Sequence, residues 1–308
     1  MSNRAAPFRV VAAAVAAILA LLCALSAQEP ARRLISTTPS VTETLCLLGL
    51  EEELVAVSDY CNYPESVKTL PRIGGLYNPN IEKIVSLRPT HVVLLKEHQE
   101  LAQRLAVFHI PTVTVDHTSV DGVVDSIRIL GRAFDRQSLG EEQSALLRRR
   151  LDQIARAAEP LEKPSVLIAI DRPKGELSEF YAAGRSPYFQ ELLEIAGGRN
   201  VLESSPAAFP TVTIETLLRL RPDIIIDLSF AGRAAGSIDD WKKLAAFLTP
   251  VAEEKVYVIT DDYATIPGPR IAQTAERFFR LLHPDAAKAE FAFRNVDFSA
   301  TITQGMEE

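Results

Sequence analysis

The chain has 308 residues, of which 33 are Lys or Arg and 40 are Asp or Glu, so its formal net charge at pH 7 is -7. An acidic chain without a basic stripe is poorly suited to the phosphate backbone of a nucleic acid, which excludes that class of partner. Hydrophobic residues make up 47% of the sequence, enough for two domains of ordinary size, each with its own core.

Residues 1–27 have the pattern of a signal peptide. Two arginines precede an apolar run from Val10 to Leu25, and the small residues Ser26 and Ala27 follow it. The uncharged run is shorter than the ~20 residues that a membrane-spanning helix needs. We therefore expect cleavage near Ser26 or Ala27 and export to the periplasm, rather than a retained anchor. A lipid anchor on Cys23 is disfavoured because Leu22, not a small residue, precedes it.

Residues 28–136 alternate strand and helix patterns, which is typical of a parallel sheet covered on both faces. Strands are expected at 33–37, 54–58, 91–95 and 112–116, and helices at 39–49, from residue 81, at 97–108 and up to residue 134. The loop from Asp59 to Asn80 is rich in Pro, Gly, Asn and Tyr and is longer than an ordinary connector. Loops of this length in compact domains are usually functional.

A single long helix is expected to follow, between residues 137 and 162. Leucines and isoleucines at helical spacing predict it over about 139–158, and it would span on the order of 30 Å. The alternation then resumes over 163–285, with strands at 166–170, 224–228 and 256–260, and helices at 188–196, 241–248 and 269–282. Trp241 has leucines three and seven residues further on, which predicts a core position. The tail at 286–308 has no strong periodicity.

One sequence unit occurs twice. NPNIEKIVSLRPTHVVLL at 78–95 and TVTIETLLRLRPDIIIDL at 211–228 share an Ile-Glu pair, a leucine, an Arg-Pro and an aliphatic run in register. Each copy predicts a short helix that stops before the proline, because proline disfavours helical geometry at the residue before it, and then a strand. Two copies at this spacing predict two similar lobes rather than a solenoid.

Metal and enzyme chemistry find little support in the sequence. Cys46 and Cys61 have no histidine nearby in sequence, and export leaves open whether they form a disulfide or stay free. The five histidines are scattered, and neither a phosphate-binding glycine loop nor a nucleophile elbow occurs. An exported α/β enzyme is therefore a remote alternative, and no cofactor or metal is expected.

Several segments together resemble a known family. They are RRLISTTPSVTETLCLLGL, DYCNYPE, GGLYNPNIEKIVSLRP, YAAGRSPYFQELLEIAGGRNVL, FPTVTIETLLRLRPDIII and PGPR, and they cover nearly all of the chain after residue 27 in order. They are similar to the substrate-binding proteins of ABC importers for cobalamin, iron siderophores and haem. The DYCNYP and NPN segments look most like the cobalamin branch. The resemblance implies two Rossmann-like α/β lobes with parallel sheets, joined by one long helix.

The resemblance also implies a role for the glutamate of each repeat. In this family one acidic residue at the tip of each lobe pairs with arginines of the permease, and the matching positions are Glu82 and Glu215. Each is expected in the first turn of a helix, where a carboxylate is also favoured by the helix dipole alone. The implied partner is an ABC permease dimer with its ATPase subunits, and we expect the binding protein to be a monomer.

The ligand is expected between the lobes, against aromatic side chains and a few polar groups. The candidate ligand-binding residues are Tyr60, Tyr77, Asn78, Arg185, Phe209, Asp262 and Tyr263. By resemblance, Phe209 and Asp262 match positions that contact ligand in cobalamin binders. Loop packing is the alternative for the aromatic residues, and a plain surface charge is the alternative for Asp262 and Arg185.

The leading hypothesis is an exported solute-binding protein, not an enzyme, that captures cobalamin or a related corrinoid and delivers it to the permease. A ferric siderophore or haem is the alternative ligand, because Arg185 could meet a carboxylate and Tyr77 could serve as an axial ligand of haem iron. A single long helix resists bending, so we expect lobe movements of only a few degrees on binding.

Overall fold

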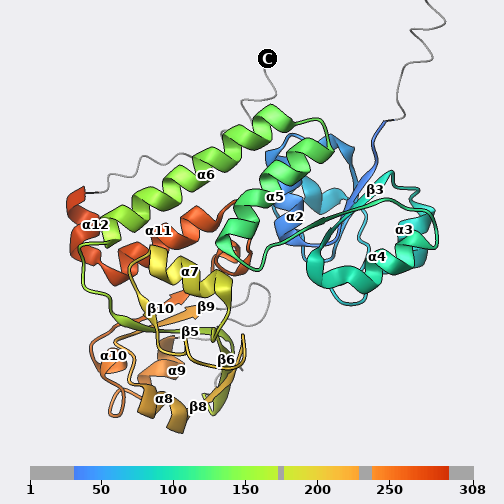
Figure 1. Ribbon diagram of the computed structural model, residues 1–308. Helices are drawn as coiled ribbons and strands as arrows, with labels where there is room; N and C mark the ends of the chain where they lie inside the picture. Colours follow the sequence, from blue (N-terminus) through green and yellow to red (C-terminus); the bar gives the residue numbers. More distant parts are fainter. Residues whose placement is uncertain (1–30, 173–176, 229–237, 291–308) are drawn as a thin grey trace, which may run out of the picture.

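The computed structural model describes residues 31–172, 177–228 and 238–290, so the expected signal peptide and residues 291–308 of the tail lie outside the described ranges. Two β-sheets, each accompanied by helices, form two lobes that the long helix α6 (Gln137–Ala158) connects (Figure 1). This is the two-lobed α/β class that the sequence predicts. Within the described ranges, no helix combines the length and apolarity needed to cross a membrane.

The first lobe is built on a four-stranded parallel sheet with strand order β2-β1-β3-β4. Its elements are β1 (Leu34–Ser36), α2 (Pro39–Leu47), β2 (Leu54–Val57), α3 (Ile81–Ser86), β3 (His91–Leu95), α4 (Gln99–Ala106), β4 (Thr112–Val115) and α5 (Val120–Ala133). Alternate residues of a strand point to opposite faces, and Leu34 and Ile35 accordingly lie in two different core clusters. Both faces of the sheet are therefore buried.

The second lobe contains a six-stranded sheet of order β10-β9-β5-β6-β8, with β7 beside β5. Its strands are β5 (Ser165–Asp171), β6 (Glu179–Ala182), β7 (Arg199–Asn200), β8 (Thr211–Thr213), β9 (Ile224–Leu228) and β10 (Val256–Ile259). Its helices are α7 (Pro187–Ile195), α8 (Ile214–Leu220), α9 (Ile238–Lys242), α10 (Thr249–Ala252), α11 (Ile271–Leu282) and α12 (Pro284–Glu290). Because β6 runs antiparallel to both β5 and β8, the expectation of parallel sheets holds fully only in the first lobe.

Helix α6 links the lobes through its own packing as well as through the chain. Its 22 residues correspond to about 33 Å at 1.5 Å per residue. Leu147, Leu151 and Ile154 are buried along one face, which packs against α5 of the first lobe and against α7 and α11 of the second (Figure 1). The relative positions of the lobes thus depend on a continuous helical layer.

The two copies of the repeat end their helices in the same way. Arg88 and Arg221, each directly before the proline, have φ angles of 48° and 47°. The left-handed conformation ends a helix and is uncommon for a residue other than glycine. Strands β3 and β9 begin three residues after these arginines. The duplication therefore extends to the backbone conformation of the joint between helix and strand.

Some local expectations were wrong. The helix expected at 241–248 is α9, which ends at Lys242 and is followed by turns up to Phe247. Strands β6, β7 and β8 were missed because they are short and partly exposed. Helix α12 continues to Glu290, past the residue at which the tail was expected to start. Cys46 and Cys61 are both free and buried, so of the two possibilities the structure has the free thiols.

Candidate functional site

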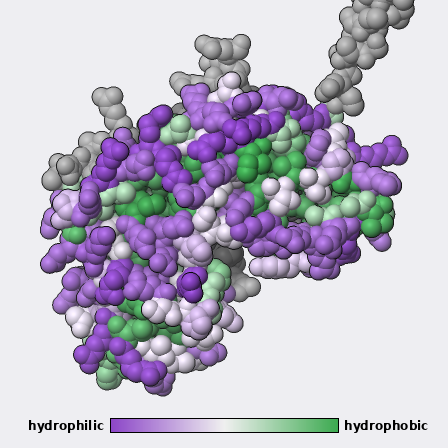
Figure 2. Space-filling model, viewed as in Figure 1, coloured by the Kyte–Doolittle hydropathy of each residue, from purple (hydrophilic) through white to green (hydrophobic). Residues whose placement is uncertain are grey.

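Ligands of parallel α/β folds bind beyond the carboxyl ends of the strands. The loop that carries Tyr60 follows the carboxyl end of β2, and Asp262 follows that of β10. These ends belong to different lobes, and the surface is hollowed where the two lobes meet (Figure 2). Candidate residues of both lobes therefore follow the carboxyl ends of strands, as this general rule requires.

Two of the first-lobe candidates, Tyr60 and Asn78, lie beside Gly75. A Cβ atom on Gly75 would lie 2.7 Å from Oδ1 of Asn78 and 3.6 Å from Cε2 of Tyr60, so these two side chains occupy the space beside the bare backbone. Tyr60 is 53% exposed and Tyr77 is 94% exposed. The long loop thus presents two aromatic rings to solvent, whereas packing within the loop would have buried them.

Two of the second-lobe candidates, Arg185 and Phe209, lie on loops that are hydrogen-bonded to each other. The amides of Gly184 and Arg185 donate to the carbonyls of Ala208 and Ala207, at 2.9 and 3.1 Å. Phe209, directly after this pair, is 50% exposed, and Arg185 is also exposed. Backbone hydrogen bonds therefore join the two loops that carry the exposed ring of Phe209 and the exposed side chain of Arg185.

Asp262 and Tyr263 differ from each other in setting. Oδ1 of Asp262 accepts from Arg270 at 2.9 Å, and its side chain is 36% exposed. Tyr263 is partly buried against the main core, and burial raises the pKa of its phenol. Asp262 is thus fixed at one oxygen and open to solvent, whereas Tyr263 contributes more of its surface to packing.

Glu82 and Glu215 occupy equivalent places on the two lobes. Both are exposed and lie in the first turns of α3 and α8, whose N-caps are Asn80 and Thr213. The pKa of Glu215 is lower than usual, because its own backbone N–H and the Thr213 hydroxyl donate to the carboxylate. Each repeat therefore presents one exposed carboxylate at the start of a capped helix.

Sequence reasoning missed a buried ion pair between the lobes. Arg270, which was noted only as part of the PGPR segment, donates from Nε and Nη2 to the two carboxylate oxygens of Glu43, at 2.9 and 2.6 Å. The side chains of Glu43 and Arg270 are 3% and 9% exposed. A single glutamate in the apolar helix pattern around Cys46 was the available signal, since a buried charge requires a partner.

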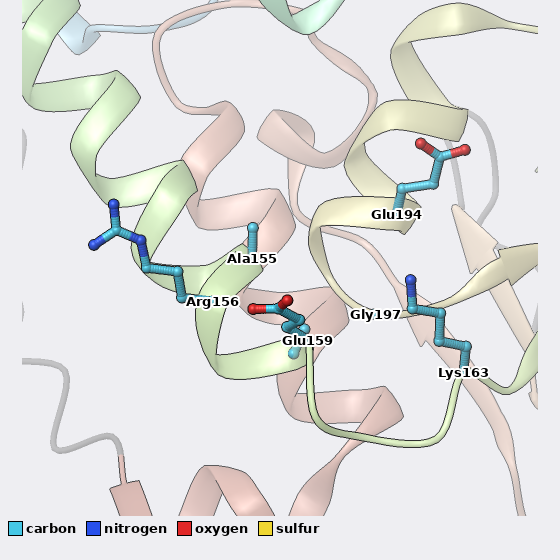
Figure 3. Close-up of a pocket in the computed structure, with 7 residues that line it drawn as sticks. Ala155, Arg156, Glu159, Lys163, Glu194 and Gly197 are labelled. Carbon is cyan, nitrogen blue, oxygen red and sulfur yellow. The ribbon is translucent and has the colours of Figure 1, made fainter.

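A separate pocket of about 310 Å³ lies at the far end of the second lobe. Ala155, Arg156, Glu159, Lys163 and Glu194 are among its lining residues (Figure 3). It adjoins the carboxyl ends of α6 and α7, whereas the N-terminus of α7 faces the first lobe. None of the candidate ligand residues lines it, so this pocket is distinct from the site between the lobes.

The described residues offer little to an enzyme. They contain no group of three His, Cys, Asp or Glu side chains able to hold a metal ion. A serine beside a histidine does occur, since the hydroxyl of Ser40 lies 2.9 Å from Nδ1 of His117. Both side chains belong to residues only 3% exposed, so a substrate would have no access to this pair.

Acidification is expected to destabilise the fold through His117. Burial lowers the pKa of His117 from 6.5 to about 4. Between these two values the unfolded chain binds more protons than the folded one, so the free energy of unfolding falls as the pH falls through this window. Between pH 7.5 and 4.5 the loss from this residue should be about 2 to 3 kcal/mol.

The acid-induced loss of stability is compared with that of the variant His117→Asn, which keeps an amide near the position of Nδ1 and does not titrate. Urea unfolding of both proteins at the two pH values measures the difference. We expect the original protein to lose about 2 to 3 kcal/mol more than the variant. Equal losses in the two proteins would contradict the assignment.

The family model described as "Periplasmic binding protein" matches residues 34–263. This range includes both sheets, helix α6 and both copies of the repeat. The chain belongs to the periplasmic binding protein family. The resemblance that the sequence motifs indicated is thereby confirmed.

Curated relatives extend over most of the chain. A vitamin B12-binding protein of Pectobacterium carotovorum subsp. carotovorum is 26% identical over 259 residues, which cover 83% of this chain and 90% of the relative. The vitamin B12-binding protein of Photorhabdus laumondii is 27% identical, with coverages of 83% and 89%. An uncharacterized ABC transporter substrate-binding lipoprotein of Bacillus subtilis is 26% identical, with coverages of 85% and 82%.

Solved structures share the fold. The periplasmic vitamin B12-binding protein of Vibrio cholerae superposes with a TM-score of 0.72 at 25% identity, covering 84% of this chain and 99% of the other. The periplasmic heme-binding protein of Roseiflexus sp. RS-1 in its apo form gives a TM-score of 0.74 at 24% identity, with coverages of 83% and 100%. A vitamin B12-binding protein and a heme-binding protein thus share this two-lobed fold.

Proposed function

We propose that this protein is an exported binding protein that captures cobalamin or a related corrinoid between its two lobes and delivers it to an ABC permease. The observation that carries the choice of ligand is that several relatives are vitamin B12-binding proteins and match nine-tenths of their own length. The site is compatible with this ligand. A corrin is large and flat, and exposed aromatic rings on both lobes can cover it with little loss of side-chain entropy.

Haem is the second candidate. The folds of two heme-binding proteins resemble that of this chain as well as the fold of the vitamin B12-binding protein of Vibrio cholerae does. Two side chains suit a haem, the 94% exposed phenol of Tyr77 as a ligand of the iron and the exposed guanidinium of Arg185 as a partner of a propionate. A ferric siderophore would use the same arginine.

Parallel titrations separate these ligands. The protein from residue 28 onward is titrated by calorimetry with cyanocobalamin, cobinamide, haemin and a ferric hydroxamate. We expect saturable one-to-one binding of cyanocobalamin and cobinamide, and markedly weaker binding of the two iron compounds. Tight binding of haemin without binding of cyanocobalamin would refute the proposal and favour the haem alternative.

Replacing Phe209 tests whether the ligand lies between the lobes. Phe209 is half exposed without ligand, so covering its remaining surface should contribute about half of the ~3 kcal/mol available from burying a phenylalanine. Phe209→Ala should therefore weaken cyanocobalamin binding about tenfold. The matched control is Phe247→Ala, because Phe247 is 70% exposed and lies in the same lobe, shortly before the amino end of β10.

We expect the control variant to bind like the original protein. If the two phenylalanine variants have the same affinity, Phe209 is not a contact and the ligand lies elsewhere.

A further inference from the structure

The side chain of Arg270 lies between the two lobes, beside residues of the proposed site. It is the N-cap residue of α11 and is 8% exposed. Its Nε and Nη2 donate to both oxygens of Glu43 on α2 of the first lobe, and its Nη1 donates to Oδ1 of Asp262 in the second lobe. One guanidinium therefore bonds to both lobes at the same time.

The aromatic surroundings extend this arrangement to the long loop of the first lobe. The guanidinium carbon of Arg270 lies 4.1 Å from the ring centroid of Tyr63 and 5.7 Å from that of Tyr263. Tyr63 is three residues after Tyr60, the candidate ligand residue of that loop. Arg270 thus supports the loop that carries Tyr60 and also the segment that carries Asp262.

The contact between the lobes around Arg270, Glu43 and Gly268, which we call the seam, is closely packed. A Cβ atom on Gly268 would lie 3.2 Å from Oε2 of Glu43 and 3.3 Å from the Cα of Ser40, so the absence of a side chain lets the two lobes approach. Burial alone would lower the pKa of Arg270, but the Glu43 carboxylate, and then that of Asp262, raise it above its usual value. The arginine remains charged and requires both partners.

We propose that Arg270 is a positioning residue that sets the spacing of the two lobes through Glu43 and aims the carboxylate of Asp262 at the ligand. Among the described residues, Oδ2 of Asp262 has no hydrogen-bond partner, so it is free to accept from an N–H or O–H group of the ligand. The amide groups at the rim of a corrin supply such donors. The ligand half of this inference rests on the proposed function, and the half that concerns lobe spacing does not.

Arginine is suited to this role by its geometry. Its planar fork donates to a carboxylate through two parallel bonds and stacks on an aromatic face, whereas a lysine ammonium acts as a point charge and does neither. Lysine at position 270 would keep the charge but could not hold Glu43, Asp262 and the Tyr63 ring together. Arg270→Lys therefore tests positioning separately from charge.

The experiment compares Arg270→Lys, Glu43→Gln and Asp262→Asn in two measurements. Spin labels on cysteines introduced at Glu100 in α4 and Arg219 in α8, both exposed, report the distance between the lobes. Cys46 and Cys61 are 2% and 0% exposed, so the native thiols do not compete for the label. Calorimetry with cyanocobalamin reports the affinity, and circular dichroism confirms that each variant is folded.

We expect three different patterns. Glu43→Gln should broaden the distance distribution and weaken binding less than Arg270→Lys does. Asp262→Asn should keep the distribution and weaken binding about tenfold, because a hydrogen bond to a charged acceptor is lost. Arg270→Lys should do both. A residue that only stabilised the second lobe would lower the resistance to urea and leave the distance between the folded lobes unchanged.

An unchanged distance distribution in Arg270→Lys overturns the proposal, whatever the affinity. A broadened distribution combined with unchanged affinity in both Arg270→Lys and Asp262→Asn overturns the part that concerns Asp262. If the original protein does not bind cyanocobalamin, the proposed function fails, and the distance measurements still decide the part that concerns lobe spacing.

Discussion

The double variant Glu82→Ala with Glu215→Ala is expected to bind ligand normally and to lose transport. Both glutamates are exposed at the first turns of α3 and α8, and neither shares a hydrogen bond with a candidate ligand residue. Their removal should therefore change the affinity for cyanocobalamin by less than about twofold, since exposed surface substitutions rarely alter the fold. We propose that the two carboxylates pair with arginines of the permease, in which case losing both should reduce uptake by at least about a hundredfold.

Uptake of labelled cyanocobalamin by cells that depend on this protein measures the loss, and calorimetry on the purified variant measures the affinity. The control is Glu52→Ala with Glu253→Ala. These glutamates are also exposed, one in each lobe, but each shortly precedes the amino end of a strand, β2 or β10. Normal uptake in the first double variant would show that the repeat glutamates serve only their helices.

The largest effect on stability is expected from Asp227→Ala. Asp227 lies in β9, and its Oδ2 accepts from Arg172 at 2.7 Å and from the indole N–H of Trp241 at 2.8 Å. The side chains of Asp227 and Arg172 are each 2% exposed. Removing Asp227 takes one of two carboxylate partners from the buried Arg172, since Asp240 stays 3.0 Å from its Nη1, and it leaves the buried indole N–H of Trp241 without its acceptor. Together these losses should cost about 3 kcal/mol.

Urea unfolding followed by the fluorescence of Trp241, the single tryptophan of the sequence, measures this cost in the second lobe. The matched control is Asp239→Ala on α9, whose ion pair with Lys242 joins side chains that are 73% and 66% exposed. A pair of this kind is worth less than about 1 kcal/mol. Similar losses in the two variants would show that the buried pair contributes no more than a surface one.

The sequence predicted the parallel strands well because their patterns are long and apolar. β3, β5 and β9 each contain a run of aliphatic residues that only a buried strand suits, and the Arg-Pro pairs mark where the preceding helices end. β6 and β8 lack such runs. Their residues alternate between exposed and buried over three or four positions, which is too short a pattern to distinguish from a loop.

The sequence indicated candidate residues within each lobe but no contacts between the lobes. Resemblance and composition could propose Tyr60 and Phe209 as candidates, because aromatic residues in long loops stand out in a sequence. The pair of Glu43 and Arg270 is separated by 227 residues, and no local pattern relates two such positions. Contacts across the seam depend on how the finished lobes meet, so they required the three-dimensional structure.

Because α6 joins the two lobes covalently, the contacts between them need to contribute less free energy to their association. In the described part of the chain this helix is the covalent connection between the lobes, so their association is intramolecular. Tethering gives each lobe an effective concentration near the other in the millimolar range or above. The bonds of Arg270 to Glu43 and of Glu191 to the amide of Val120 then add to the packing of α6 against helices of both lobes, although alone they would be too few to join two separate proteins at cellular concentrations. If the ligand binds between the lobes, as we propose, it meets both halves of its site already assembled, and little of its binding energy is needed to bring them together.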